Sequence, residues 1–199
     1  TLNNVDLYLY GTSNGHRSIN VHDGGTLEII NSEVLPYIGT YYYNFKANSS
    51  STVTIQNSDF EKPYTLDFYT NDVDLSHVTV NNSMHDSIKL RSGSIYTIDN
   101  VSVNNSGNHG IELTTFKNSD NHYDNITVKN SYEFGINHIS SSTGNLTLTN
   151  SLIQSSRGYV QFLSDSPTTV KLMNSTISDA TSNGYNIIGI KHTGANSVL

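Results

Sequence analysis

Apolar residues recur at fixed positions around a polar residue, nearly always asparagine, that returns about every 24 residues. The eight members of this series are Asn4, Asn31, Asn57, His77, Asn100, Asn125, Asn150 and Asn174. An apolar residue lies two positions before each member, and another lies three positions after it. The intervals between members are 27, 26, 20, 23, 25, 25 and 24 residues. Such a repeat predicts stacked copies of one small unit, because a unit of this size cannot bury its apolar face alone.

A second apolar pair follows each member of the series, with one residue between its two positions. The pairs are Ile19/Val21, Tyr43/Phe45, Leu66/Phe68, Ile88/Leu90, Ile111/Leu113, Ile136/His138, Val160/Phe162 and Ile188/Ile190. Alternation with period two predicts strands rather than helices. We therefore predict an all-β parallel β-helix over residues 1–199, with about eight coils of about 24 residues and three parallel sheets. The asparagines would turn the chain in the left-handed conformation and hydrogen-bond to one another along the stack.

Three segments resemble the generic repeat of the right-handed parallel β-helix, or pectin-lyase-like, superfamily: "NNSGNHGIEL", "KNSYEFGINHI" and "SSRGYVQFL". The asparagine series is similar to the asparagine turn between the second and third strands of that family. The resemblance implies a right-handed coil and a polysaccharide partner. It also implies an extracellular, cell-surface or virion-surface location, with substrates along the outer face of the first strand. It leaves the activity open, because this fold hosts lyases, hydrolases, epimerases, tail spikes and adhesins.

Composition excludes some classes of binding partner. The net charge is −7 with only ten Lys and Arg, which disfavours nucleic acid and anionic membrane surfaces. No run approaches the roughly 20 apolar residues that cross a membrane. The chain begins inside the repeat pattern without a signal peptide, so we expect a module of a larger surface protein. Both ends look uncapped, so we also expect neighbouring domains or further copies of the chain to cover them.

The outward row of the predicted first strand is where chemistry is expected. Its charged members are Asp67, Lys89 and Glu112, and it also contains Asn20, Asn44, Asn137 and Gln161. The next outward position adds Tyr69 and Arg91, and the turn before the strand adds Asp86 and His109. We take Asp67, Lys89, Arg91, His109 and Glu112 as catalytic candidates, and Tyr42, Tyr69, Asp86, Asn137 and Gln161 as substrate-binding candidates.

Several functions fit this row. Asp67 and Glu112 would lie two coils apart, roughly 9–10 Å, near the wider carboxylate separation of inverting glycosidases. A lyase or epimerase of uronic acids would use Lys89 and Arg91 for the sugar carboxylate. Its base would be His109, or a Lys or Arg with a lowered pKa. Noncatalytic glycan binding is a further alternative. The opposing interpretation is a column of alternating charges that neutralise one another on a structural or adhesive rod.

Cofactor signals are weak. The eight His residues show no metal-binding spacing, so we expect no metal site and no cofactor. Residues 118–125, "NSDNHYDN", offer oxygen ligands for calcium but lack a calcium-binding repeat, and we interpret them as a loop. His138 takes an inward position matched by Leu113 and Phe162, which predicts a core histidine rather than a ligand.

Overall fold

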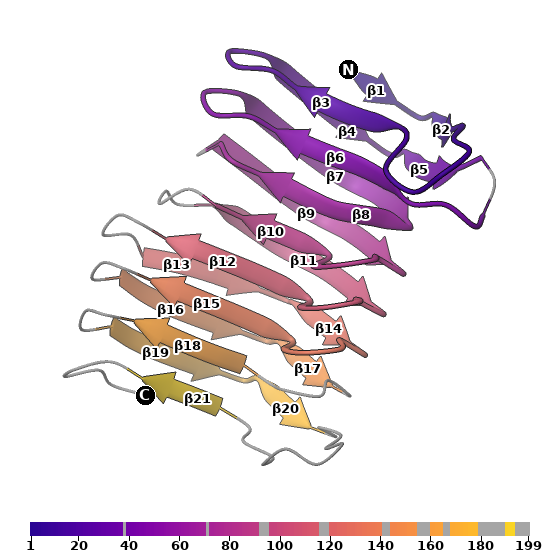
Figure 1. The fold of residues 1–199 in the computed structure, drawn as a ribbon. Coiled ribbons are helices and arrows are strands. Elements are labelled where there is room, and N and C mark those ends of the chain that lie inside the picture. Colours follow the sequence, from indigo (N-terminus) through magenta and orange to yellow (C-terminus); the bar gives the residue numbers. More distant parts are fainter. Residues whose placement is uncertain are drawn as a thin grey trace.

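The computed structural model describes residues 1–37, 39–70, 72–91, 96–115, 120–140, 144–154, 160–164, 168–178 and 190–193. Strands of successive repeats stack on one another from the N-terminus to the C-terminus, with one sheet in front of the other (Figure 1). The result is an all-β parallel solenoid with about six turns of about 25 residues. About eight coils were predicted, so the count was too high. At the N-terminal end, β1 (Leu2–Asn3) spans only two residues.

The smaller sheet holds the strand of each repeat that carries the alternating apolar pair. Its eight strands pair in the order β21-β18-β15-β12-β10-β8-β6-β3. Their bounds are β3 Ser18–Val21, β6 Tyr43–Ala47, β8 Pro63–Phe68, β10 Ile88–Leu90, β12 Ile111–Thr115, β15 Ile136–Ser140, β18 Val160–Ser164 and β21 Ile190–Thr193. All of these pairings are parallel.

The larger sheet has thirteen strands and combines the two sheets that were predicted to be separate. One row consists of β1, β4 Thr26–Ile30, β7 Thr52–Glu61, β9 Asp72–Asn81, β11 Thr97–Asn104, β13 Asp120–Asp124, β16 Gly144–Thr149 and β19 Thr168–Met173. The other strands are β2 Asp6–Leu9, β5 Glu33–Pro36, β14 Thr127–Lys129, β17 Leu152–Gln154 and β20 Thr176–Ser178. The prediction of three sheets was therefore wrong. The long strands β7, β9 and β11 run through the bend and join both rows.

The asparagine series marks this bend in every repeat. All eight members, including His77, have a positive φ between 47° and 54°, which confirms the predicted left-handed turn. The side chains also form ladder-like hydrogen bonds. Asn174 Nδ2 donates to Asn150 Oδ1 at 3.4 Å, and Asn150 Nδ2 donates to Asp124 Oδ1 at 2.9 Å. The column thus bends the chain and links successive turns of the solenoid.

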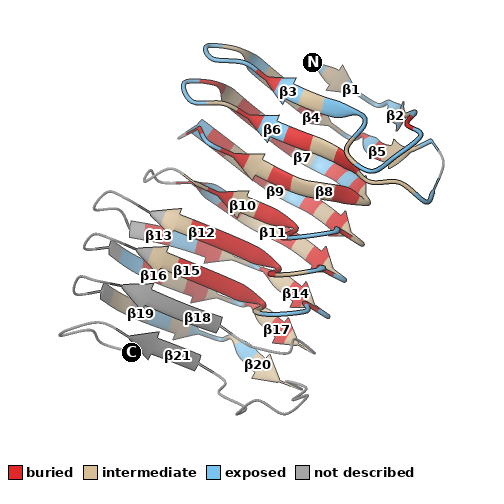
Figure 2. Ribbon diagram, in the orientation of Figure 1, coloured by how far each residue is buried: buried red, intermediate tan, exposed pale blue. Residues whose placement is uncertain are grey.

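The core lies between the two sheets and consists of stacked apolar side chains. Along the strands, buried and more exposed residues alternate (Figure 2). In β9, for example, Val73, Leu75, Val78 and Val80 are buried, and the alternation shifts by one residue at His77. Phe45 packs edge-on against Phe60, which joins the smaller sheet to the larger one. The outer face of the smaller sheet is left free for polar side chains.

Candidate functional site

Strand register brings the predicted outward row together as one column. Asp67 pairs with Lys89, Lys89 with Glu112, and Glu112 with Asn137. Gln161 follows Asn137 in register, but its side chain lies outside the described part of the chain.

The second coil contributes Lys46 to this column, not the predicted Asn44. The pairing of β6 with β8 shifts between Tyr43 and Phe45, so Phe45 pairs with Leu66 and Lys46 with Asp67. Lys46, Asp67, Lys89 and Glu112 therefore alternate in charge along four neighbouring strands.

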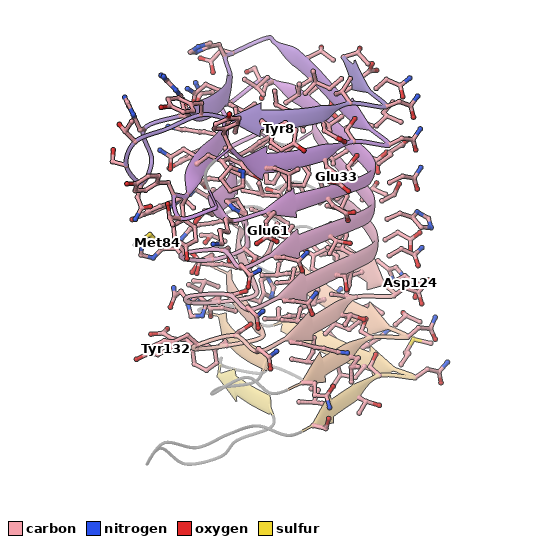
Figure 3. All side chains as sticks on the ribbon, turned by 90° about the vertical axis from the view of Figure 1, so that its right-hand side faces the viewer. Tyr8, Glu33, Glu61, Met84, Asp124 and Tyr132 are labelled. Carbon is pink, nitrogen blue, oxygen red and sulfur yellow. The ribbon has the colours of Figure 1, made fainter. Side chains whose placement is uncertain are left out.

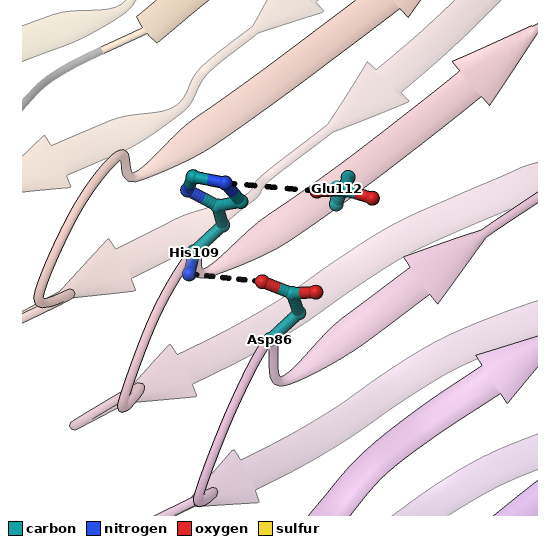
Figure 4. Close-up of side chains that lie close together, drawn as sticks. All are labelled: Asp86, His109 and Glu112. Atoms are coloured by element: carbon teal, nitrogen blue, oxygen red, sulfur yellow. Dashed lines mark hydrogen bonds and ion pairs between the residues drawn. The ribbon is translucent and has the colours of Figure 1, made fainter.

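Four ionisable side chains lie close together at the middle of the smaller sheet; we call Asp86, Lys89, His109 and Glu112 the buried cluster. Asp86, His109 and Glu112 are 5%, 6% and 8% exposed. Lys89 Nζ lies 3.2 Å from Asp86 Oδ2 and also contacts Glu112 Oε1. His109 donates its backbone N–H to Asp86 Oδ1, and its ring faces Glu112 (Figure 4). The turns before β10 and β12 place Asp86 and His109, and the strands themselves place Lys89 and Glu112.

Lys89 stays a cation in this setting. Burial alone would lower its pKa, but the hydrogen bond to Glu112 and the charges of Asp86 and Glu112 outweigh burial and raise the pKa above its usual value. The hypothesis that Lys89 acts as a base required a lowered pKa, and the shift runs the other way. The strand of Lys89 lies between those of Asp67 and Glu112, and an inverting hydrolase would need a water between these two carboxylates.

The ring of His109 is oriented by its neighbours. Nδ1 accepts the backbone N–H of Phe134 at 3.2 Å, and the two rings stack with centroids 5.4 Å apart. This bond assigns the hydrogen of the neutral imidazole to Nε2. Nε2 lies 3.6 Å from a carboxylate oxygen of Glu112 and 3.6 Å from one of Glu133. In this tautomer His109 presents a donor to the carboxylates, and its lone pair is taken by the backbone.

Asp86, His109 and Glu112 also have the spacing of metal ligands, with donor atoms within 4.8 Å of one another. Two observations argue against a metal in this arrangement. The Lys89 ammonium already lies between the two carboxylates, and His109 Nε2 carries a hydrogen where a ligand needs a lone pair. The segment considered for calcium is partly strand, because Asp120–Asp124 form β13; residues 116–119 lie outside the described residues.

Arg91, Asp67, Tyr69 and Lys46 form a second group beside the buried cluster. Arg91 binds Asp67 with two donors, Nε at 2.6 Å and Nη2 at 3.2 Å. Burial would lower the pKa of Arg91, but the hydrogen bond to Asp67 outweighs burial and raises the pKa above its usual value. Arg91 therefore cannot act as a base. Lys46 Nζ and Arg91 Cζ lie 4.6 and 4.9 Å from the centre of the Tyr69 ring. Tyr69 is 38% exposed, and its ring holds both cations by cation–π contacts.

A groove of about 520 Å³ runs over the outer face of the smaller sheet and connects the two groups. Its lining includes Lys46, Tyr64, Asp67, Asp86, Lys89 and Arg91. His85 closes one side, where its Nε2 pairs with the Tyr64 hydroxyl at 2.8 Å. Charged and aromatic side chains thus share one elongated hollow above strands of consecutive coils.

A model of the family described as "right handed beta helix region" matches residues 17–177. The chain belongs to this family. The matched range contains the whole groove and the buried cluster of this β-helix. Neither the comparison with curated proteins nor that with solved structures gave a match. Among the described residues of this protein, no α-helix is long and apolar enough to cross a membrane.

Of the remaining candidates, Asn137 adjoins the buried cluster, whereas Tyr42 and His138 lie elsewhere in the β-helix. Asn137 donates from Nδ2 to Glu112 Oε2 at 3.3 Å, so it extends the buried cluster by one coil. Tyr42 does not reach the groove. It lines a second cleft with Asn82, Asn105 and Tyr132. His138 is buried at 4% exposure, as predicted for a core histidine, and burial lowers its pKa to about 4.

Several side chains of the groove and the buried cluster were not predicted from the sequence. Lys46 was missed because the pattern "YYYNF" conceals the register shift, although Phe45 and Ala47 also alternate correctly. Asn108 was missed although it donates to Asp86 Oδ1 at 2.8 Å. Glu133 lies in the turn one coil after His109, where no pattern distinguished it. The repeated "NNS" at 81–83 and 104–106 was the available signal for the second cleft.

Proposed function

We propose that this β-helix recognises an acidic polysaccharide of the uronic-acid type in the groove over the smaller sheet. The observation that carries the proposal is the gathering of cations. Lys46, Lys89 and Arg91 line one groove in a chain that has only ten Lys and Arg and a net charge of −7. Lys46 and Arg91 both lie over the ring of Tyr69, so this half-exposed aromatic ring holds two of the cations in place at the groove. With this ligand we also propose a location outside the cell or on a cell or virion surface.

Recognition fits the groove better than cleavage does. Both carboxylates in the groove are already held by charge-assisted bonds: Asp67 by Arg91, and Asp86 by Lys89, Asn108 and the His109 backbone. A carboxylate so occupied is a weak base and a weak nucleophile. The raised pKa values of Lys89 and Arg91 make them cations for binding rather than bases.

Lyase, epimerase or hydrolase chemistry is the second candidate, and the buried cluster is the observation that favours it. Withdrawing Asp86, His109 and Glu112 from water beside Lys89 is costly, and proteins concentrate such arrangements at functional sites. The alternation of Lys46, Asp67, Lys89 and Glu112 supports the structural or adhesive rod instead, because these charges neutralise one another without a ligand.

Isothermal titration calorimetry with polygalacturonate, alginate and a neutral galactan tests the proposal. We expect the wild type to bind an acidic polymer, and Lys46→Gln or Tyr69→Ala to weaken this binding by about tenfold. Lys171→Gln, an exposed cation on the larger sheet, is the matched control and should change little. Equal losses in Lys46→Gln and Lys171→Gln, or no binding of either acidic polymer, would overturn it. Release of reducing ends or unsaturated products would instead establish the catalytic candidate.

A further inference from the structure

A second column of left-handed asparagines lies at the other corner of the coils, between the larger sheet and the next strand of the smaller sheet. Asn82, Asn105 and Asn130 have φ values of 55°, 58° and 57°. Asn105 Nδ2 donates to Asn82 Oδ1 at 3.0 Å, and Asn130 Nδ2 donates to Asn105 Oδ1 at 3.1 Å. Asn82 Nδ2 in turn donates to Glu61 Oε1 at 2.8 Å. The carboxamides are therefore fixed in one orientation over three consecutive coils.

These bonds use only part of each carboxamide. An asparagine side chain has two N–H donors and an oxygen with two lone pairs, and the ladder takes one donor and at most one lone pair. Asn105 and Asn130 are exposed. Each rung can still offer a donor and an acceptor to a ligand, and the rungs repeat with the spacing of the coils, about 4.8 Å.

A cleft of about 360 Å³ lies over this column. Tyr42 and Tyr132 line it together with the asparagines, and Tyr132 is 51% exposed. Tyr132 projects from the same edge of the solenoid as Met84 (Figure 3). Gly107 in the lining adds no side chain, and Ser83 and Ser106 add only small hydroxyls. The cleft therefore combines a fixed row of amides with two tyrosine rings.

We propose that this second cleft binds a neutral oligosaccharide. Pyranose rings present an apolar face that stacks on tyrosine and hydroxyls that pair with amides. Among the described residues, the lining consists of tyrosine, asparagine, serine and glycine and contains no cation for an acidic sugar, in contrast to the groove. A ladder that repeats at each coil suits a ligand that also repeats. The proposal does not depend on the function of the groove, because the two linings share no residue.

The test is NMR and calorimetric titration of the full chain with cellohexaose, xylohexaose and N-acetylchitohexaose, and with hexagalacturonate for contrast. We expect at least one neutral hexasaccharide to bind and to shift the side-chain amide signals of Asn105 and Asn130. Tyr132→Ala should weaken that binding by about tenfold or more. Asn105→Gly, which keeps the left-handed backbone accessible, should weaken it several-fold.

Two controls separate this cleft from the rest of the surface. Tyr8→Ala removes a tyrosine that is 56% exposed on β2, and Lys46→Gln alters only the groove; both should bind the neutral sugar as the wild type does. Thermal melting of each variant shows whether it is folded. The proposal is wrong if none of the three neutral sugars binds, if Tyr8→Ala loses as much affinity as Tyr132→Ala, or if hexagalacturonate displaces the neutral sugar from the cleft.

Discussion

The two sheets of this β-helix follow the same repeat but differ in regularity. In the larger sheet, eight left-handed residues bend the chain with φ values within a few degrees of one another. In the smaller sheet and the corner before it, the structure departs from the regular repeat at several places. The register shifts at Tyr43 and Phe45, charged side chains become buried around Lys89, and His138 faces the core. The regular sheet supports the stack, and the smaller sheet with the corner before it carries the side chains that we assign to a ligand.

The difference follows from what each corner must do. The bend inside the larger sheet has at most two residues between its strands, and a left-handed asparagine, or His77 in one coil, makes it in each repeat. The corner before the smaller sheet holds longer turns, and these present Asp86, His109 and Tyr132. Variation there changes the surface while the ladder of backbone hydrogen bonds is kept.

The largest effect is expected where a turn before the smaller sheet packs on the next coil. A Cβ at Gly110 would lie 2.3 Å from Val128 Cγ1 and 2.5 Å from the backbone oxygen of Gly135. Gly110→Ala should therefore cost about 3 kcal/mol of unfolding free energy, measured by denaturant titration. Gly39→Ala is the matched control, because nothing lies within 4 Å of a Cβ there, and it should cost under about 0.5 kcal/mol. Similar midpoints for the two variants would show that the turns are not tightly stacked.

A loss of unfolding free energy of comparable size, but only at acidic pH, is expected from the protonation of His138. Its pKa is about 4 in the folded chain because of burial, against 6.5 for an ordinary histidine. Between these values the unfolded chain takes up a proton that the folded chain excludes, so the unfolding free energy falls as the pH is lowered from 6.5 to 4. The total loss is about 3 kcal/mol.

The variant His138→Leu should lose this part of the pH dependence, since leucine matches Leu113 in the neighbouring strand. His122→Gln, an exposed histidine of the larger sheet, is the control. Denaturant titrations at several pH values between 4 and 7 measure the difference. An unchanged pH slope in His138→Leu would contradict the assignment.

The smallest effect is expected at the bend of the larger sheet. Asn100→Ala places a Cβ in the left-handed region and should cost about 1 kcal/mol, whereas Asn100→Gly avoids that strain. Asn105→Ala should cost more than Asn100→Ala, because it also breaks two rungs of the side-chain ladder. Thermal melts of the three variants test the ranking. If Asn100→Ala lowers the melting temperature more than Asn105→Ala does, the column at the bend contributes more to stability than the second column.

The fold could be predicted because its signals are local and repeated. An asparagine, an apolar residue two positions before it and another three positions after it specify the bend in every coil. The merging of two sheets was not predictable, since it depends on whether hydrogen bonding continues through His77 and Asn100. The site was predictable as far as strand register carries it: Asp67, Lys89, Glu112 and Asn137 do form one column. The pairing of charges, the tautomer of His109 and the position of Tyr42 depend on turns whose course no repeat specifies.

In-register stacking also determines how the β-helix comes apart. Each strand of the smaller sheet between β3 and β21 pairs with the strand of the coil before and the coil after, so the stack should separate first at its least stable coil. Protonation of His138 in strand β15 destabilises that coil in acid. Asn130 and Tyr132, which line the second cleft, lie immediately before β15, whereas the groove lining ends at Asn108. Acid should therefore unfold the second cleft before it unfolds the groove. The two proposed binding surfaces of one solenoid should then be lost at different pH values.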